Sequence, residues 1–189
     1  MTDTYPDFKT LFEHAQEGKD FLVKVNDRGS SLLIMAPHGG NIEPGTTEIA
    51  GLIAGKSYSF YSFEGLRSVD NLTLHISSNN YDEPRAMALM ATSDIILTIH
   101  GLRDRGEFIV LGGLHETLRE KIADALRVAG FVVDPSYARK FPATHPSNIC
   151  NKGLSRKGVQ LEISRDLREP ADLALRVSFA ETIKKALEI

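Results

Sequence analysis

The sequence contains no tryptophan and only one cysteine, Cys150. A single cysteine excludes an intramolecular disulfide and a cysteine-rich zinc module. Aromatic residues make up 7% of the chain, which disfavours a stacking surface for single-stranded nucleic acid. The 22 Lys and Arg residues are outnumbered by 25 Asp and Glu residues, for a net charge of -3. The chain is therefore not basic overall, and we expect no nucleic-acid partner.

Long apolar runs are also missing. No segment approaches the roughly 20 apolar residues that a membrane-spanning helix needs. The first seven residues, MTDTYPD, have neither the basic start nor the following apolar stretch of a secretory signal. We therefore expect a cytoplasmic protein without membrane contact, with release by lysis or by a non-standard route left open.

The composition that remains is that of a folded domain. The chain has 189 residues, of which 42% are hydrophobic and 25% are charged. This length supports one domain with a core that needs no disulfides. No repeat, low-complexity tract or linker divides the sequence, and helical and strand-like segments alternate. We predict a single, monomeric α/β domain over residues 1–189, with an open mixed sheet between helices on both faces.

The hydrophobic pattern predicts the individual elements. The predicted strands cover residues 21–25, 31–36, 58–63, 72–76, 94–99, 108–111, 131–133 and 158–164. The predicted helices cover residues 8–15, 44–55, 118–129 and 175–187, and a short helix follows the polar loop 79–84. Residues 139–157 are predicted to be irregular, and so long an irregular stretch is more often functional than idle.

Two histidines follow the two most apolar strands. His38 lies in the segment Pro-His-Gly-Gly, interpreted as a loop, and His100 follows residues 94–99. Glu43 comes five residues after His38. Ligands of open α/β sheets bind beyond the carboxyl ends of the strands, so the three residues predict a zinc site that leaves a fourth position for water. The alternative is that each histidine bonds to its own loop and that Glu43 is an exposed or helix-capping carboxylate.

The other histidines are weaker candidates. His75 is predicted on the strand 72–76, where it either lines the site or is a hydrogen-bonded, partly buried histidine; we favour the second interpretation. His145 is predicted in a loop, and His14 and His115 are predicted at the surface.

Glu162 is the most informative carboxylate. In the strand 158–164 it shares one face with Gln160 and Ser164, while the apolar residues share the other face. Either this is an edge strand with a solvated face, or Glu162 is a general base beside a metal-activated water. The pattern does not separate these two interpretations.

Several arginines follow the same strand ends. Arg103 and Arg105 come after His100, and Arg165 and Arg168 come after Glu162. Arginine binds carboxylates with two parallel hydrogen bonds, so these residues suit an anionic substrate. The alternative is an ordinary solvated charged face.

Cys150 suggests a different chemistry. It lies near His145, Asn148 and Asn151, which are residue types found in thiol hydrolases. Such catalytic groups are usually assembled from distant segments, so their closeness in sequence is no evidence for them. We interpret Cys150 as a packing residue.

Five segments resemble one known family, the poly-γ-glutamate hydrolases of phages and their bacterial relatives. The segments are MAPHGGNIEPGTTEIA (35–50), NNYDEP (79–84), TIHG (98–101), NICNKG (148–153) and GVQLEIS (158–164). They span most of the chain, and the first is long and specific. The resemblance implies a zinc-dependent amidohydrolase with a carboxypeptidase-like fold.

The resemblance also implies roles for individual residues. His38, Glu43 and His100 would be the zinc ligands, and Glu162 the catalytic carboxylate. The order of these residues is similar to that of zinc carboxypeptidases, although Glu43 follows the first histidine by five residues rather than three. The implied reaction is hydrolysis of the γ-glutamyl amide bonds of an anionic polymer. Its carboxylates would be bound by a further set of residues, Arg165, Arg103, Arg105 and Asn151.

Two alternatives stay open at the level of sequence. One is a zinc amidase that acts on a small N-acyl amino acid or a peptidoglycan fragment. The other is a non-catalytic, phage-derived binding protein that keeps the fold.

Overall fold

The computed structural model describes residues 3–137, 139–169 and 173–188. Its centre is a seven-stranded sheet with the order β1-β3-β2-β4-β7-β5-β6. The strands are β1 (Phe21–Asn26), β2 (Leu32–Gly40), β3 (Ser59–Gly65), β4 (Ile95–Gly101), β5 (Phe108–Gly112), β6 (Val132–Val133) and β7 (Val159–Ile163). Strands β3, β2, β4 and β7 are mutually parallel, whereas β1 and β5 are antiparallel to their inner neighbours. The sheet is therefore mixed, as predicted.

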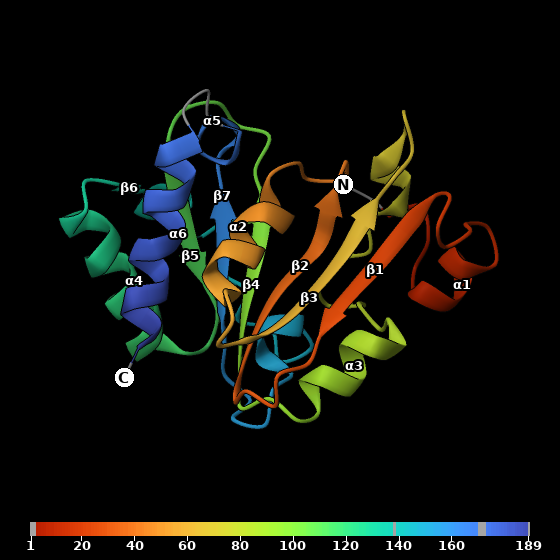
Figure 1. The fold of residues 1–189 in the computed structure, drawn as a ribbon, viewed down its shortest axis with the longest axis horizontal. Helices are drawn as coiled ribbons and strands as arrows, with labels where there is room; N and C mark the ends of the chain where they lie inside the picture. The colour runs from red at the N-terminus through yellow and green to blue at the C-terminus, as the bar shows by residue number, and fades with distance from the viewer. Residues whose placement is uncertain (1–2, 138, 170–172, 189) are drawn as a thin grey trace.

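Helices cover both faces of this sheet. The α-helices are α1 (Phe8–Phe12), α2 (Thr46–Ala54), α3 (Pro84–Met90), α4 (Glu116–Val128), α5 (Arg165–Arg168) and α6 (Leu173–Leu187). Short 3-10 helices are η1 (Asn71–Leu74), η2 (Pro135–Tyr137) and η3 (Ile149–Asn151). Helices α2, α4 and α6 lie over one face, and α1 and α3 belong to the other layer (Figure 1). None of the helices in the described ranges combines the length and apolar character needed to cross a bilayer.

Alternation along the strands divides the core into two clusters. In β7, Val159, Leu161 and Ile163 pack with α2, α4 and α6. Gln160 and Glu162 are buried as well, but they are not part of that apolar cluster. Successive side chains of a strand point to opposite faces, so Glu162 lies on the side of the sheet opposite α6. The pattern in the sequence thus predicted the face of Glu162 correctly.

Strand β7 is an interior strand. It pairs with β4 on one side and with β5 on the other. The interpretation of Glu162 as an exposed residue of an edge strand is therefore wrong, and its side chain is 8% exposed.

Two local predictions also fail. Residues 72–76 form no strand; η1 occupies Asn71–Leu74, and His75 follows it in extended conformation. The segment around His38 is not a loop but the end of β2, which pairs with β3 up to Gly40. The register shifts between Ala36 and Gly39, and this irregularity accommodates Pro37, which has no N–H to donate to the ladder.

Candidate functional site

The carboxyl ends of β2, β4 and β7 open into a cavity of about 890 Å³. His38, Glu43, His100 and Glu162 line it together with His75. Three of these residues lie on or directly after three adjacent parallel strands, which is why segments distant in sequence converge here. The cavity therefore lies at the carboxyl ends of the strands, where the sequence predicted the site.

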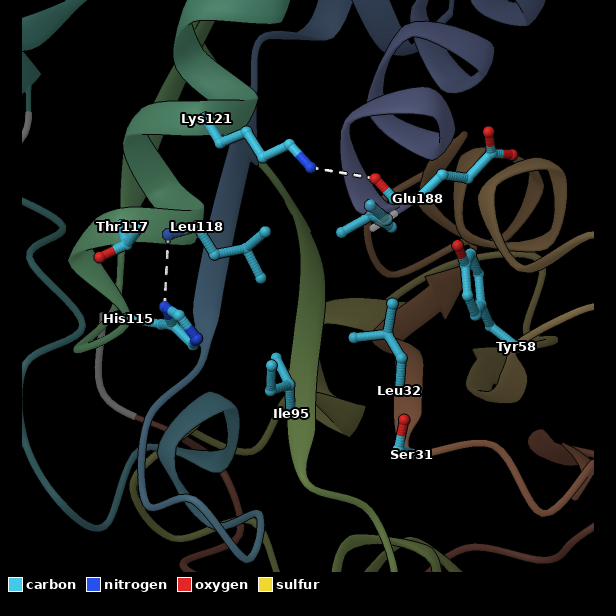
Figure 2. A pocket seen from close by; sticks show the side chains of 10 residues that line it. Ser31, Leu32, Tyr58, Ile95, His115, Thr117, Leu118, Lys121 and Glu188 are labelled. Carbon is cyan, nitrogen blue, oxygen red and sulfur yellow. Dashed lines mark hydrogen bonds between the residues drawn. The ribbon is translucent and has the colours of Figure 1, made fainter.

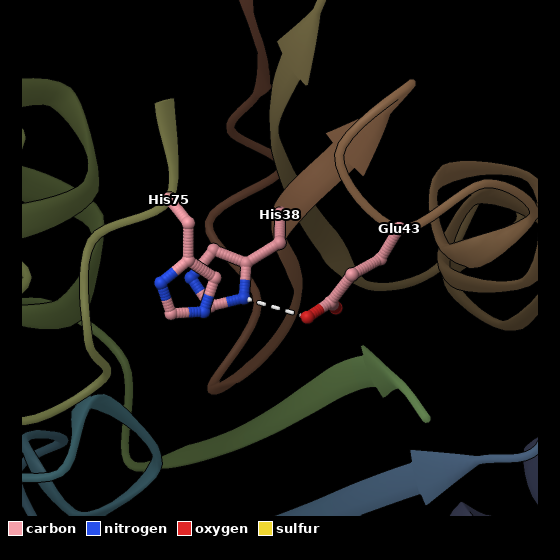
Figure 3. Close-up of side chains that lie close together, drawn as sticks. All are labelled: His38, Glu43 and His75. Carbon is pink, nitrogen blue, oxygen red and sulfur yellow. Dashed lines mark hydrogen bonds and ion pairs between the residues drawn. The ribbon is translucent and has the colours of Figure 1, made fainter. Parts of the chain in front are cut away.

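His38 and Glu43 face each other across the turn that follows β2 (Figure 3). The Nδ1 atom of His38 lies 3.2 Å from Oε1 of Glu43. The backbone holds this turn, because the Glu43 amide donates to the His38 carbonyl at 2.9 Å. The side-chain pair is consequently fixed by local backbone structure before α2 begins.

His100 completes the group from the neighbouring strand β4. Its Nδ1 lies 3.2 Å from Nδ1 of His38 and 3.8 Å from Oε2 of Glu43. Both imidazoles are buried, and both point the same ring nitrogen at the same small space. Two imidazole nitrogens and a carboxylate at these separations form a donor set that suits zinc.

The remaining polar atom of each of these three side chains contacts protein. Nε2 of His38 donates to the Ile76 carbonyl at 2.8 Å, and the Gly101 amide donates to Oε2 of Glu43 at 2.8 Å. Nε2 of His100 lies 3.4 Å from the Ser78 hydroxyl. A carbonyl only accepts, so the neutral His38 ring keeps its Nδ1 lone pair for the shared space. Outer contacts of this kind orient the ligands in metal sites, and the residues present therefore fit zinc.

The charges of the three groups are interdependent. Burial disfavours the charged form of His38, but the Glu43 carboxylate and the Ile76 carbonyl outweigh it and raise the pKa of His38. Burial likewise opposes ionisation of Glu43, but the charge of His38 keeps the pKa of that carboxyl low. Burial and the positive charge of His38 together lower the pKa of His100 to about 3. In the metal-free protein His38 therefore holds a proton more readily than an isolated histidine, and His100 holds one less readily.

His75 is an alternative to His100 as the third metal ligand. One donor atom from each of His38, Glu43 and His75 can be chosen so that all three lie within 4.8 Å of one another. The His75 ring lies against the His38 ring, with 3.9 Å between centroids (Figure 3). Its Nδ1 is bonded to the Asp3 carboxylate at 2.7 Å, which leaves Nε2 available. His75 is thus both hydrogen-bonded, as predicted, and part of the cavity lining.

Glu162 is held by an amide relay on its own face of the sheet. Gln160 donates from Nε2 to Oε1 of Glu162 at 2.9 Å, and Asn148 donates to Oε1 of Gln160 at 3.1 Å. Burial raises the pKa of Glu162 well above its usual value, and the charge of Glu43 adds to this, while Arg168 opposes it. A carboxyl group with a raised pKa can both accept and donate a proton near neutral pH.

The expected substrate-binding residues separate into two sets. Arg103 and Arg165 line the cavity; Arg165 is also paired with Glu169 at 3.1 Å. Arg105 is outside the cavity lining and is bonded to Asp166 at 2.8 Å. The two sets share the same strand ends, but only the first faces the buried cluster.

Asn151 lies in the interior rather than in the cavity wall. It is 1% exposed, and its amide donates to the carbonyls of Ala143 and His145 at 2.8 and 3.1 Å. Its oxygen accepts from the amides of Leu114 and Gly158, both at 3.2 Å. With every polar atom used by backbone groups, Asn151 holds the irregular segment against the sheet, and direct substrate contact does not fit this position.

Cys150 is buried, and among the described residues no basic group affects the pKa of its thiol. Burial raises the pKa of its thiol to about 12, and its Sγ lies 3.9 Å from the Ala143 carbonyl. A thiolate is the nucleophilic form of cysteine, so this environment supports the packing role.

A second cavity, of about 390 Å³, lies at the opposite edge of the sheet. It is mostly apolar and lies between α4, α6 and the starts of β2 and β4 (Figure 2). Two of its polar groups bond to nearby backbone: Nδ1 of His115 accepts from the Leu118 amide at 3.3 Å, and Lys121 donates to the Glu188 carbonyl at 3.0 Å. These groups do not converge on a point, so the candidate active site is the cavity at the carboxyl ends of the strands.

The sequence missed Gln160 and Asn148 as functional residues. The one signal for Gln160 was its position two residues before Glu162, on the same face of the strand. Asn148 gave no signal, because its contact with Gln160 spans twelve residues and depends on how η3 packs on the sheet.

Comparisons with known proteins show the family to which the chain is similar. The family model described as poly-gamma-glutamate hydrolase matches residues 5–181. The UPF0714 protein YndL of Bacillus subtilis (strain 168) is 34% identical over 171 residues, which cover 88% of this chain and 66% of YndL. The chain thus spans slightly less than two thirds of the length of that relative.

Two solved structures have the same fold. A bacteriophage poly-gamma-glutamate hydrolase superposes with a TM-score of 0.91 at 33% identity, covering 98% of this chain and 96% of the other. A zinc-free apo structure of YndL superposes with a TM-score of 0.90 at 30% identity, covering 99% and 98%. On the family match over nearly its whole length, and on the fold it shares with the phage enzyme, the chain belongs to the poly-gamma-glutamate hydrolase family.

Proposed function

We propose that the protein is a zinc-dependent hydrolase that cleaves the γ-glutamyl amide bonds of poly-γ-glutamate. One observation carries the proposal: Nδ1 of His38, Nδ1 of His100 and the Glu43 carboxylate converge within 3.2–3.8 Å. The buried Glu162 lies on the adjacent strand, directly paired with His100. Family membership supports the reaction class and the polymer. The apo, zinc-free description of the YndL structure supports the choice of metal.

His38, Glu43 and His100 are the proposed zinc ligands. Zinc, when bound, lowers the pKa of a water molecule and polarises a carbonyl oxygen. The three side chains leave the side of the cavity open for that water and for the substrate carbonyl. We choose His100 over His75 because Nδ1 of His100 lies 3.2 Å from Nδ1 of His38 and 3.8 Å from Oε2 of Glu43, whereas His75 is bonded to Asp3 through its own Nδ1.

Glu162 is the proposed general base and acid. Its carboxylate takes a proton from the attacking water and then gives it to the leaving nitrogen of the amide. The raised pKa of Glu162 suits the second step, and the Gln160 amide fixes the carboxylate in place for both. The chain therefore needs no second acid for this reaction.

The substrate carries one carboxylate per unit, and the cavity wall carries positive charge. Arg103, Lys140 and Arg165 all line the cavity. We propose that Arg103 and Arg165 bind carboxylates of the polymer on either side of the cleaved bond. Arg105, which lies outside the cavity lining, contributes at most to attraction at longer range.

The first experiment measures zinc per chain by elemental mass spectrometry. Wild-type protein should hold about one zinc, and His38→Ala and His100→Ala should hold almost none. His75→Ala should keep its zinc. Full zinc in both His38→Ala and His100→Ala would refute the ligand assignment. Loss in His75→Ala with retention in His100→Ala would transfer the third ligand to His75.

The second experiment compares substrates at equal concentration of amide bonds. Poly-γ-glutamate should be cleaved, and α-linked polyglutamate should not. Turnover only of small N-acyl amino acids or peptidoglycan fragments would replace the proposed substrate. Bound zinc without turnover of any amide would identify a binding protein.

A further inference from the structure

Arg168 is a buried cation that takes no part in the reaction described above. It is the last residue of α5 and is 3% exposed. All three guanidinium nitrogens donate to backbone carbonyls. Nε bonds to Ile163 at 3.0 Å, Nη2 bonds to Leu102 at 2.9 Å, and Nη1 bonds to Pro44. Three of its five N–H donors are thus held by the backbone, and the side chain also lines the cavity.

Each of those carbonyls belongs to a segment that carries a residue of the site. Pro44 directly follows Glu43, and Ile163 directly follows Glu162. Leu102 comes two residues after His100. The planar guanidinium has donors in a rigid fork, so three bonds fix the three segments relative to one another. Backbone contacts between β4 and β7 hold two of them already, but the turn bearing Glu43 lies beyond the paired part of the sheet.

Gly101 provides room for this arrangement. A Cβ atom placed on Gly101 would lie 2.5 Å from Cζ of Arg168 and 2.7 Å from its Nε. The guanidinium thus packs directly on the backbone between His100 and Leu102. The same Gly101 donates its amide to Glu43, so the ligand carboxylate and the arginine contact one short stretch of chain.

Arg165, on the same short helix, is a natural comparison. Its side chain is half exposed, and its Nε donates to the Glu169 carboxylate at 3.1 Å. Both arginines line the cavity, but the guanidinium of Arg168 is the one bonded to carbonyls at the ends of β4 and β7.

We propose that Arg168 is a positioning residue that sets the relative placement of Glu43, His100 and Glu162, and so determines zinc affinity and turnover rather than substrate affinity. This inference rests on the proposed zinc site. It predicts that disturbing the guanidinium weakens the metal site even though Arg168 is not a ligand.

The direct test replaces Arg168 by lysine or methionine in the full chain. Arg168→Lys keeps the charge but loses the fork, and Arg168→Met loses both. Zinc affinity, measured by chelator competition, should fall about 10–100-fold in each, as for other residues that support metal ligands. The absorption bands of the cobalt-substituted protein should shift, because they report ligand geometry. With poly-γ-glutamate, kcat should fall by a similar factor, while KM changes less than about threefold.

Gly101→Ala tests the same placement with Arg168 still present. The added methyl group must displace the guanidinium, so zinc affinity should fall in the same direction and the cobalt bands should shift. The matched control is Gly51→Ala, because a Cβ on Gly51 meets no atom within 4 Å. Arg127→Lys, on the exposed side of α4, is the control for the arginine change. Both controls should keep wild-type zinc affinity and kcat.

The outcomes separate three possibilities. Wild-type zinc affinity and cobalt spectrum in Arg168→Lys and Gly101→Ala, with only a lower melting temperature, would overturn the inference. If both Arg168 variants fail to fold, Gly101→Ala decides the question by the same two readouts. If the wild type binds zinc but does not cleave the polymer, the proposed function fails while the zinc and cobalt measurements still test Arg168.

Discussion

The two edges of the sheet each carry a hollow, and they differ in what their polar groups do. At the amino ends of β2 and β4, the cavity between α4 and α6 is apolar, and its His115 and Lys121 bond to nearby backbone. At the carboxyl ends, His38 and Glu43 are each bonded to a backbone group outside the cavity, and Nδ1 of His38 faces Nδ1 of His100 inside it. The convergence of lone pairs therefore identifies the candidate active site better than the apolar area of a cavity does.

The largest effect is expected from the carboxylate that does not bind metal. Glu162→Gln keeps the size of the side chain but removes the proton acceptor, so turnover of poly-γ-glutamate should fall about 10²–10⁴-fold. Zinc content should stay at the wild-type level, since Glu162 is not a proposed ligand. Loss of zinc in this variant would instead make Glu162 part of the metal site.

Acid should weaken zinc binding with a defined slope. The pKa of His38 is raised, so in the metal-free protein His38 keeps its proton to higher pH and zinc must displace it. The pKa of His100 is lowered to about 3 and that of Glu43 is also lowered, so neither adds a competing proton in mildly acidic solution. Below the pKa of His38, the zinc dissociation constant should rise about tenfold per pH unit, which is the release of one proton. Chelator competition from about pH 4 to pH 7 would measure it; a hundredfold rise per unit would mean that both histidines are protonated.

A smaller effect should distinguish the two arginines outside the buried cluster. Arg165→Gln removes a charge from the cavity wall, and KM should rise about 2–5-fold with kcat unchanged, because exposed ion pairs contribute about 0.2–1 kcal/mol. Arg105→Gln, outside the lining, should change KM less. Steady-state rates at low salt would show the difference, and equal effects of the two changes would argue for binding by overall charge alone.

The smallest effect is expected at the amino edge. Lys121→Met removes one exposed hydrogen bond to the Glu188 carbonyl, so the free energy of unfolding should change by no more than about 0.5 kcal/mol. Turnover and zinc content should be unchanged. Urea unfolding and the same rate assay would test this, and a clear loss of turnover would connect the amino edge to the reaction.

The sequence predicts the α/β sheet and most of its elements, because buried strands and amphipathic helices leave distinct periodic patterns. It also predicts His38, Glu43 and His100 as a group, since each lies at or just after a strand that is apolar enough to be central. The failed predictions have local causes. Leu72, Leu74 and Ile76 alternate like a strand, yet residues 71–74 form η1, and the segment is not among the seven strands of the described sheet.

The contacts that support the site were beyond a pattern analysis. The Arg168 guanidinium and the Asn148–Gln160 relay join segments that are far apart in sequence, and their roles follow from tertiary packing. Asn151 shows the opposite error, in which the sequence suggests a role that the packing does not support. A polar residue in a motif resembles a substrate contact, but its partners prove to be four backbone groups.

His100 and Glu162 are directly paired across β4 and β7, so the sheet fixes the distance between a proposed zinc ligand and the proposed general base. Neighbouring strands lie about 4.8 Å apart, and a shift by one residue turns a side chain to the opposite face. One inserted or deleted residue within β4 or β7 would therefore remove its group from the cavity altogether. Length changes in the loop that carries Arg103, or in the segments that follow α5, leave this spacing unchanged. Within such a scaffold, the preference for a substrate can diverge through the loops while the reacting groups keep their spacing.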